Sequence, residues 1–239
     1  MIVSDQPARG TTDTPARPHT VAIMQPYFIP YAGYFRLFAA SDLFVIYDCV
    51  QFPRRGWVHR NKLIDVSGEE RWVTLPLVKA PQSVLIKDLE FPADASEQIN
   101  ARMQPFPDVM SPPAGAESIV EALLQAKGTP LTYIELLLKR ITEYLGLRWN
   151  VLRSSSLEIP PELHGQDRIL EIIRRIGAHC YLNAPGGREL YSRTAFDEAG
   201  VELNFLPDYD GPTSSILARI LIENRDRLAA ELSGSIVRR

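Results

Sequence analysis

The fold is decided by a stretch near the N-terminus, residues 20–47, which reads TVAIMQPYFIPYAGYFRLFAASDLFVIY. Its two ends, residues 20–24 and 43–47, are short apolar runs rich in β-branched and aromatic side chains, as expected of buried strands. Between them, residues 34–40 suit a helix of about two turns. A strand, a helix and a strand within 28 residues predict a βαβ unit with parallel strands and a right-handed crossover.

The remainder of the chain extends this unit into a larger sheet. Helical spacing of Leu and Ile predicts helices over residues 131–145 and up to residue 176, which Gly146 and Gly177 are suited to end. Other strands are expected at 71–77, 149–152, 179–182 and 201–205, and a short apolar run occurs at 84–86. Another helix is expected at 194–199. One final helix is expected after Pro212, carrying Ile216, Ile220 and Leu228. The sequence therefore predicts an α/β fold, with a mostly parallel Rossmann-like sheet, helices on both faces and a mainly helical part.

Proline marks a different region, residues 91–130, which contains six of the 19 prolines. The part between Pro105 and Pro113 cannot form a regular helix. We expect a lid-like insertion here, either structured or loose, with a short helix near residues 116–126. Residues 1–19 are expected to form a flexible leader and Arg238-Arg239 a frayed end, so that residues 20–239 form a single α/β domain.

Composition excludes several classes of protein. The 26 basic and 29 acidic side chains nearly cancel, so no global field attracts nucleic acid or an anionic membrane. Two separated cysteines, Cys49 and Cys180, cannot build a disulfide framework, which favours a reducing compartment. No apolar run approaches the ~18 residues of a membrane span, and the N-terminus does not resemble a secretory signal. We expect a cytoplasmic protein with no nucleic-acid partner and no membrane insertion, and the oligomeric state stays open.

The loop after the first strand, residues 25–35, contains two prolines, one glycine and five aromatic residues. Prolines make such a loop rigid, and Gly33 permits a close approach of backbone to a ligand or to a neighbouring strand. Ligands bind beyond the carboxyl ends of the strands in open parallel sheets, so the loop is placed where a ligand would be. An aromatic corner that only packs the helix on the sheet is the alternative.

Residues 22–63, AIMQPYFIPYAGYFRLFAASDLFVIYDCVQFPRRGWVHRNKL, resemble the WbqC-like family. The likeness is dense over residues 21–77 and continues in residues 180–191, CYLNAPGGRELY, which look like the family's second block. That family is found among genes of bacterial O-antigen and polysaccharide biosynthesis and near some natural-product pathways, so the resemblance implies a biosynthetic role. Cys49 stands where the family commonly has a carboxylate and His59 where it commonly has Asn, so those two roles are not transferred.

Several residues near the predicted strand ends are candidates for chemistry. Asp48 follows the second strand and could act as a general base, or cap a turn. Cys49 could be a nucleophile with His59 as its base, although a buried, inert thiol is the commoner fate. The amides of Gln25 and Gln51 could orient a polar substrate, or cap backbone groups.

A basic segment follows, residues 54–62, which reads RRGWVHRNK and carries four permanent cations. Guanidinium groups bind phosphate or carboxylate through paired hydrogen bonds, and an indole can stack on a base or a sugar. The alternative is a solvated basic face. Arg55, Arg60 and Asn61 fall on the family pattern and are the members that we expect to bind an anionic substrate.

The second block supplies another set of candidates. Backbone N–H groups at Gly186 and Gly187 could bind an anion, and Tyr191 could present its phenol there, unless the segment is only a tight turn. Asn183 precedes them and is expected to orient a substrate. Tyr31 belongs to the segment YAGY, which has a formal similarity to the HxGH motif of nucleotidylyltransferases but lacks both histidines. No metal-binding motif occurs, no cofactor is required, and a nucleotide is compatible with these residues.

These candidates predict a transferase of bacterial polysaccharide or specialised-metabolite biosynthesis. Its substrate would be an activated anionic molecule, such as a nucleotide-linked amino sugar or an acyl or aminoacyl group bound to a carrier protein. Asp48 would be the base, Arg55 and Arg60 would hold the anionic carrier, and Gln25 with Asn183 would orient the acceptor. One alternative is a diverged nucleotidylyltransferase-like protein that binds nucleotides, and another is a non-catalytic binding or scaffold subunit.

Overall fold

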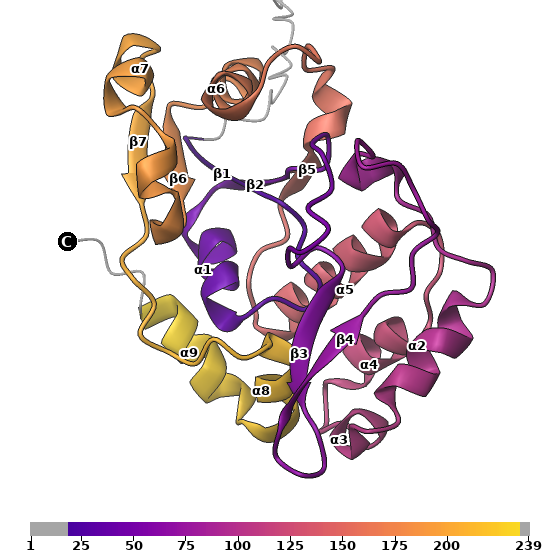
Figure 1. Ribbon diagram of the computed structural model, residues 1–239. Helices are drawn as coiled ribbons and strands as arrows, with labels where there is room; N and C mark the ends of the chain where they lie inside the picture. The colour runs from indigo at the N-terminus through magenta and orange to yellow at the C-terminus, as the bar shows by residue number, and fades with distance from the viewer. Residues whose placement is uncertain (1–18, 235–239) are drawn as a thin grey trace, which may run out of the picture.

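A five-stranded parallel sheet lies at the centre of a computed structural model that describes residues 19–234 (Figure 1). Its strands are β1 (Thr20–Met24), β2 (Leu43–Ile46), β5 (Val151–Arg153), β6 (Cys180–Asn183) and β7 (Glu202–Phe205). Their spatial order is β5-β2-β1-β6-β7, so the chain first builds outward on one side of β1 and then on the other. This order confirms the predicted Rossmann-like sheet. The direction in which successive strands are added to the sheet reverses between β1 and β6. Apart from His19, the expected leader and the expected frayed end lie outside the described residues.

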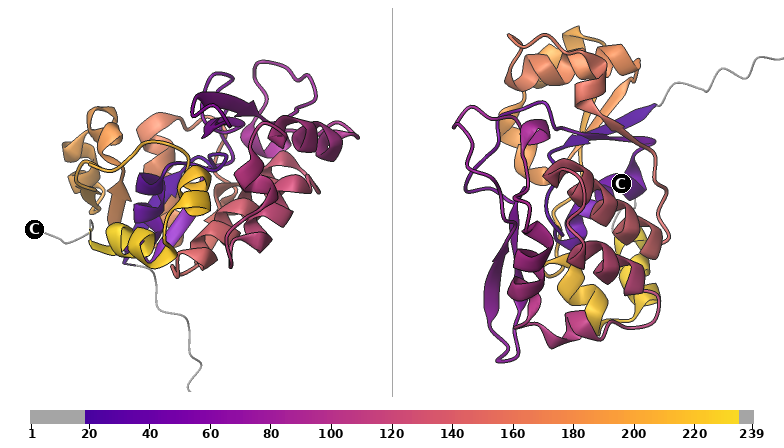
Figure 2. Two further views of the ribbon diagram at one scale, coloured as in Figure 1. Left: turned by 90° about the horizontal axis from the view of Figure 1, so that it is seen from below. Right: turned by 90° about the vertical axis from the view of Figure 1, so that its right-hand side faces the viewer.

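The alternation of side chains along β1 separates two hydrophobic cores. Ala22 faces a core that contains α1 (Ala32–Ala40), α5 (Pro130–Tyr144), α8 (Ile216–Ile222) and α9 (Arg225–Gly234). Val21 and Ile23 face the opposite side, where α6 (Gly165–Ile176) and α7 (Arg193–Glu198) cover the sheet. Helices therefore lie on both faces, as Figure 2 also shows, and confirm the predicted layer arrangement.

Aromatic stacking holds the nine-residue helix α1 on the sheet. Phe38 of α1 stacks on Phe44 of β2 with ring centroids 4.0 Å apart, and on Trp149 at 5.6 Å. Phe35 and Phe44 are also fully buried. Burial of each such side chain contributes about 1.5–3 kcal/mol, so packing rather than capping stabilises this helix, whose N-cap makes no side-chain hydrogen bond.

Residues 50–130 lie outside the parallel sheet. They form an antiparallel hairpin, β3 (Arg60–Ile64) with β4 (Glu70–Thr74), then η1 (Ile86–Asp88), α2 (Ala95–Met103), α3 (Pro107–Met110) and α4 (Glu117–Leu124). The apolar run at 84–86 is not a strand: Leu85 makes an isolated bridge to Gln51, and the N–H of Ile86 donates to the carbonyl of Val50. Its backbone is thus paired within loops. The proline-rich segment contributes buried residues such as Ile99 and Met103 to the first core.

The prediction of one final helix is wrong, because the chain breaks between α8 and α9. Glu223 adopts an extended backbone, and its carboxylate accepts hydrogen bonds from Arg219 at 2.7 and 2.8 Å. The side chain of Asn224 then accepts from the backbone N–H of Arg227 at 3.1 Å, at the start of α9. These tertiary and capping bonds turn the chain so that α9 packs on α1.

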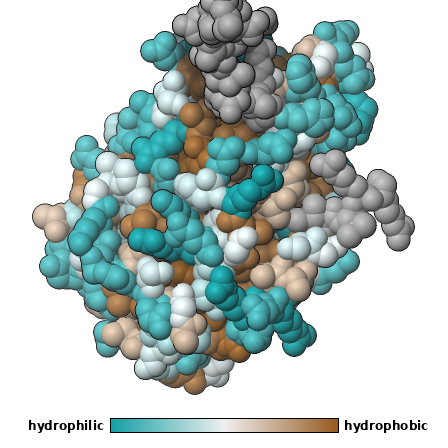
Figure 3. All heavy atoms as spheres, turned by 180° about the vertical axis from the view of Figure 1, so that it is seen from behind, coloured by the Kyte–Doolittle hydropathy of each residue, from teal (hydrophilic) through white to brown (hydrophobic). Residues whose placement is uncertain are grey.

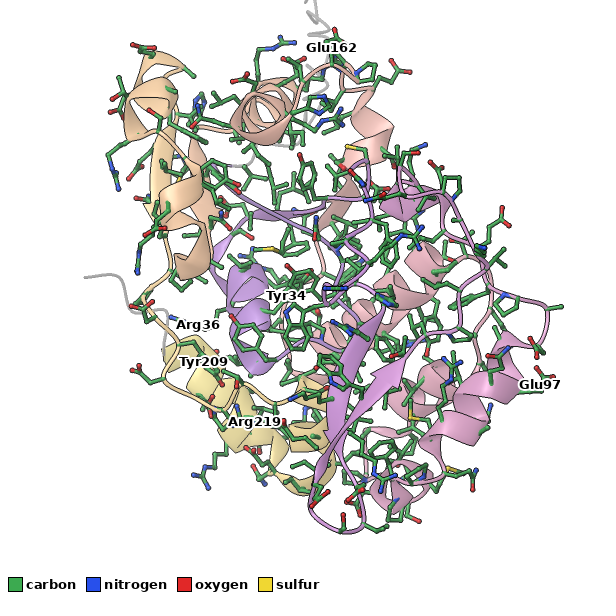
Figure 4. The ribbon with its side chains drawn as sticks, in the orientation of Figure 1. Tyr34, Arg36, Glu97, Glu162, Tyr209 and Arg219 are labelled. Carbon is green, nitrogen blue, oxygen red and sulfur yellow. The ribbon has the colours of Figure 1, made fainter. Side chains whose placement is uncertain are left out.

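A buried ion-pair network ties this C-terminal unit to the rest of the protein. Arg219, whose side chain is 5% exposed, donates to Glu231 at 2.7 Å and to the hydroxyl of Tyr209 at 2.8 Å. Tyr209 in turn lies 5.6 Å from Tyr31, centroid to centroid, and the guanidinium of Arg36 lies 5.7 Å from its ring (Figure 4). Hydrogen bonds from Arg219 hold the pKa of Glu231 at about 2, below its ordinary value of 4.5.

This network predicts an acid-sensitive contribution to stability. Because the pKa of Glu231 is depressed in the folded state, the contribution is complete above pH 4.5 and is lost as the pH falls toward about 2. Glu231→Gln should therefore lower the free energy of unfolding at pH 7, and the difference from wild type should shrink by about pH 2.5. Urea unfolding followed by circular dichroism at both pH values measures this.

The control for that experiment is Glu97→Gln, because Glu97 is exposed on α2 and points away from the protein (Figure 4). Its unfolding free energy should match that of wild type at each pH. An equal loss for Glu231→Gln at pH 7 and at low pH would contradict the assigned charge network.

Candidate functional site

A cavity of about 700 Å³ opens between the carboxyl ends of β1 and β6, where the strand order reverses. Met24 and Gln25 border it from β1, and Asn183 borders it from β6. The proline-aromatic loop, residues 25–31, and the segment 184–191 form much of the rest of its wall. The position is the one at which open α/β sheets bind ligands.

The polar groups of this cavity are neutral. None of the described residues that line it carries a charged side chain. Its polar side chains are three amides, one threonine hydroxyl and five phenols, namely Gln25, Asn61, Asn183, Thr213, Tyr27, Tyr31, Tyr34, Tyr47 and Tyr191. Burial raises the pKa of Tyr27, Tyr31, Tyr34 and Tyr47, so these four phenols stay protonated at neutral pH. Such a lining suits hydroxyl and amide groups of a ligand better than phosphate.

The structure brings together candidates from both family-like blocks. Seven of the expected site residues line the cavity: Gln25, Tyr31, Asn61, Asn183, Gly186, Gly187 and Tyr191. Six others do not: Asp48, Cys49, Gln51, Arg55, His59 and Arg60. Four further lining residues were not predicted as site residues: Tyr27, Tyr47 and Thr213, whose spacing shows no motif, and Tyr34, which the sequence places only within the segment YAGY.

Asn61 holds the wall of the cavity in place. Its side-chain N–H groups donate to the carbonyls of Phe28 at 3.1 Å and Ile29 at 2.8 Å, and the hydroxyl of Ser215 donates to the same Ile29 carbonyl at 2.7 Å. Ile29 has a φ of +39°, a left-handed conformation that costs a β-branched residue about 1–3 kcal/mol. Three hydrogen bonds thus fix the loop in a conformation that its sequence alone disfavours.

The two glycines of the second block have different surroundings. A Cβ at Gly187 would lie 2.3 Å from the side-chain nitrogen of Asn183, whereas one at Gly186 would meet nothing within 4 Å. The other side-chain atom of Asn183, Oδ1, accepts from the N–H of Ala184 at 2.8 Å. Gly187 therefore leaves room for the amide of Asn183, and Gly186 lies at the exposed rim.

Asp48 connects β2 to the 3₁₀ helix η2 (Ser154–Leu157). One carboxylate oxygen accepts from the hydroxyl of Ser154 and from the N–H of Ser155, both at 2.8 Å, and the other accepts from the hydroxyl of Ser155 at 2.6 Å. Asp48 is 0% exposed. Both oxygens are engaged within the protein, so the geometry assigns this carboxylate to holding the carboxyl ends of β2 and β5 together.

Cys49 has Arg168 and Ser154 as its polar neighbours. The sulfur lies 3.1 Å from Nη1 of Arg168 and 3.1 Å from the hydroxyl of Ser154. Arg168 also donates to backbone carbonyls, including that of Cys49 at 3.0 Å. His59 packs edge-on against Phe52, and burial together with the charge of Arg60 lowers its pKa to about 4, so its imidazole is neutral at pH 7.

The cations of the basic segment do not line the cavity, although Trp57 and Asn61 of the same segment do. Arg60 lies over the ring of Trp72, with its guanidinium carbon 4.4 Å from the centroid, and donates to the carbonyl of Arg55 at 2.7 Å. Arg55 and Gln51 border a second, shallower hollow of about 510 Å³, where Gln51 donates to the carbonyl of Gln82. Trp57 joins the two regions, because it lines the main cavity and belongs to the basic segment.

Residues 19–234 contain neither a cluster that could hold a metal ion nor a helix that could span a membrane. No group of three His, Cys, Asp or Glu side chains in this range is arranged to hold a metal ion. No helix within the same residues has the length and apolar character needed to cross a bilayer.

The contacts of Asp48 predict a structural effect of its substitution. Asp48→Asn replaces one acceptor oxygen by a donor opposite Ser154 or Ser155, so it should lower the free energy of unfolding by about 1–3 kcal/mol. Ser155→Ala should also destabilise, by about 1 kcal/mol, whereas Ser118→Ala on the exposed side of α4 should not. Urea unfolding measures all three, and an Asp48→Asn protein of wild-type stability would contradict this assignment.

The glycine pair provides a matched test of the cavity. Gly187→Ala should displace the amide of Asn183 and destabilise the protein by about 1–3 kcal/mol, as other overpacking substitutions do. Gly186→Ala should have little effect, because its new methyl group meets only solvent. Thermal unfolding of the two variants compares them, and equal midpoints would show that the Asn183 amide does not need the space.

Sequence comparisons relate this chain to a protein family and to one curated protein. The WbqC-like protein family matches residues 25–213, from Gln25 at the end of β1 to Thr213, both of which line the cavity. The chain is also similar to the uncharacterized protein Rv1507c of Mycobacterium tuberculosis (strain ATCC 25618 / H37Rv), with 29% identity over 196 residues that cover 80% of this chain and 83% of that protein. No solved structure matches the chain. Because the family match spans most of the sequence, the protein belongs to the WbqC-like family.

Proposed function

We propose that this protein is a transferase of bacterial polysaccharide or specialised-metabolite biosynthesis. Its substrate is an activated anionic molecule, such as a nucleotide-linked amino sugar or a carrier-bound acyl or aminoacyl group, and the uncharged part of that molecule occupies the cavity. The observation that supports this most is the cavity of about 700 Å³ at the strand-order reversal, with its neutral amide and phenol lining. Family membership supports the biosynthetic context.

The chemistry of the lining favours a hydroxyl- or amino-bearing group in the cavity. Tyrosine rings provide flat apolar surfaces, and their protonated hydroxyls donate hydrogen bonds. The amides of Gln25 and Asn183 can both donate and accept, and so can orient an acceptor that presents several hydroxyls. A charged phosphate would have no opposite charge in the cavity lining, so the anionic part of the substrate stays outside, near Arg55 and Arg60.

The contacts of Asp48 change the role that we assign to it. An attacking amine needs access to the base, and both oxygens of Asp48 are hydrogen-bonded to Ser154 and Ser155. We therefore assign Asp48 a positioning role. It holds the end of β2 and thereby keeps Tyr47, the residue directly before it, at the cavity wall.

A nucleotidylyltransferase-like activity has less support. In such enzymes the first histidine motif stabilises negative charge on the triphosphate, and here Tyr31 and Tyr34 occupy those positions. The hydroxyl of Tyr34 donates to the backbone carbonyl of Gln25 at 2.8 Å and is buried. Neutral phenols provide no cation for a triphosphate.

Gln25 offers a direct test of the proposed function. The purified protein is mixed with nucleotide-linked amino sugars and with carrier proteins charged with acyl or aminoacyl groups, and products are followed by mass spectrometry. Gln25→Ala should lower kcat/KM by about tenfold or more, as expected when a hydrogen bond of about 1.4 kcal/mol to the substrate is lost.

The matched control is Gln104→Ala, because Gln104 is an exposed amide outside the cavity lining. It should react at the wild-type rate. A Gln25→Ala protein that converts substrate as fast as wild type would contradict the placement of the acceptor, and the absence of any product across the panel would contradict the transferase function.

A further inference from the structure

Two exposed tryptophans pack against each other beside the cavity. The rings of Trp57 and Trp72 lie 5.5 Å apart, centroid to centroid, with planes inclined by 35°. Trp57 is 45% exposed and Trp72 is 47% exposed, although most large apolar side chains of the protein are buried. The face seen in Figure 3 carries many hydrophilic residues with hydrophobic patches between them. We call Trp57 and Trp72 the tryptophan platform.

The tryptophan platform is continuous with the cavity. Trp57 lines the cavity, and Trp72 on strand β4 lies next to Trp57 on the exposed side of the hairpin. The backbone also fixes this arrangement, because the N–H of the buried Phe28, next to Tyr27 of the cavity lining, donates to the carbonyl of Trp57 at 3.0 Å. A ligand longer than the cavity can therefore extend directly onto the tryptophan platform.

Positive charge accompanies the exposed rings. The guanidinium of Arg60 lies 4.4 Å from the centroid of Trp72, and the amine of Lys62 lies 5.3 Å from it. Lys62 forms an ion pair with Glu70 at 2.8 Å. Among the described residues, Arg60 and the exposed Arg55 form no ion pair, so their charges are available to an anion.

An exposed aromatic pair with adjacent cations has few suitable ligands. An anionic membrane is disfavoured, because exposed Glu69 and Glu70 lie at the turn of the same hairpin and would be repelled. A molecule with one aromatic ring system and a nearby pair of negative charges fits both features, since rings stack on tryptophan and phosphates bind guanidinium groups.

We propose that the tryptophan platform binds the nucleobase of a nucleoside diphosphate, the carrier part of the activated substrate. The base stacks on the exposed ring of Trp57 beside Trp72, the diphosphate lies against Arg55 and against Arg60, which Trp72 holds in place, and the attached sugar enters the cavity past Trp57. This inference rests on the proposed function, and it selects the nucleotide-linked substrate over the substrate bound to a carrier protein.

Intrinsic fluorescence tests this inference, because two of the three tryptophans form the tryptophan platform. UDP, ADP, CDP and GDP are titrated separately into the full-length protein, with the four corresponding nucleosides and inorganic pyrophosphate as partial ligands. At least one diphosphate should quench the fluorescence with saturation. Its nucleoside should bind about tenfold more weakly, and pyrophosphate should not quench.

Variants locate the binding surface. Trp72→Ala should weaken diphosphate binding by about tenfold or more, and Trp72→Phe, which keeps an aromatic ring, should restore part of it. Arg60→Ala should weaken the diphosphate but not the nucleoside, whereas Arg148→Ala, an exposed cation elsewhere, should change neither. Isothermal calorimetry measures the same affinities for the variants without reliance on fluorescence, and circular dichroism verifies that each is folded.

The outcomes separate this inference from the proposed function. Diphosphate binding that depends on Trp72, in a protein without transferase activity, would support the tryptophan platform and contradict the function. If the protein transfers a group from a nucleotide-linked sugar and both Trp72→Phe and Trp72→Ala leave the rate unchanged, the proposed function is supported and the tryptophan platform is contradicted. The inference is overturned if no diphosphate binds at about 10 mM. It is also overturned if the folded Trp72 variants bind diphosphates as well as wild type does but bind phosphatidylglycerol vesicles less well.

Discussion

The carbonyl of Ile29 is the point on which the site depends. It accepts from Asn61 of the β3–β4 hairpin and from Ser215 at the start of α8, while the adjacent carbonyl of Pro30 accepts from the N–H of Ile216 at 2.8 Å. Segments from the N-terminal, middle and C-terminal parts of the chain thus meet at one strained turn. Without these bonds, a left-handed isoleucine would relax toward an extended conformation, and the loop that forms the cavity wall would move with it. The position of Trp57 depends on the same turn, through its hydrogen bond to Phe28.

The periodicity of the sequence predicted the sheet well, because β1, β2 and α1 are determined by local pattern and burial. The same periodicity could not predict contacts between residues that are far apart in the sequence. The bonds from Ser154 and Ser155 to Asp48 join positions more than 100 residues apart, and a run of three serines has no feature that identifies its partner. The ion pair of Arg219 with Glu231, across the break before α9, likewise forms only when the two helices pack. An unbroken helical pattern contains no signal for such an interaction.

The family resemblance identified candidate residues but not their separate roles. Asn61 and Arg60 are neighbours on β3, and alternation along the strand sends Asn61 inward to the loop and Arg60 outward to Trp72. The spacing of a motif cannot distinguish these two directions unless residues 60–64 are already known to form a strand. The same holds for the two glycines of the second block. The side-chain amide of Asn183 requires a glycine at Gly187, and no neighbouring atom requires one at Gly186. The pair of adjacent glycines therefore contains one residue that leaves room for the Asn183 amide and one that lies at the exposed rim of the cavity.

The separation of charge from the cavity has a physical cause. A cation inside an apolar pocket would need a permanent partner, because removing a charge from water costs several kcal/mol that a transient ligand does not always offset. At the exposed rim, Arg55 and Arg60 remain hydrated when no ligand is present, and the cost is avoided. A phosphate attracted there leaves its uncharged substituent at the entrance marked by Trp57. Neutral groups inside and cations outside would thus orient an activated substrate along one direction, with its anionic end toward solvent.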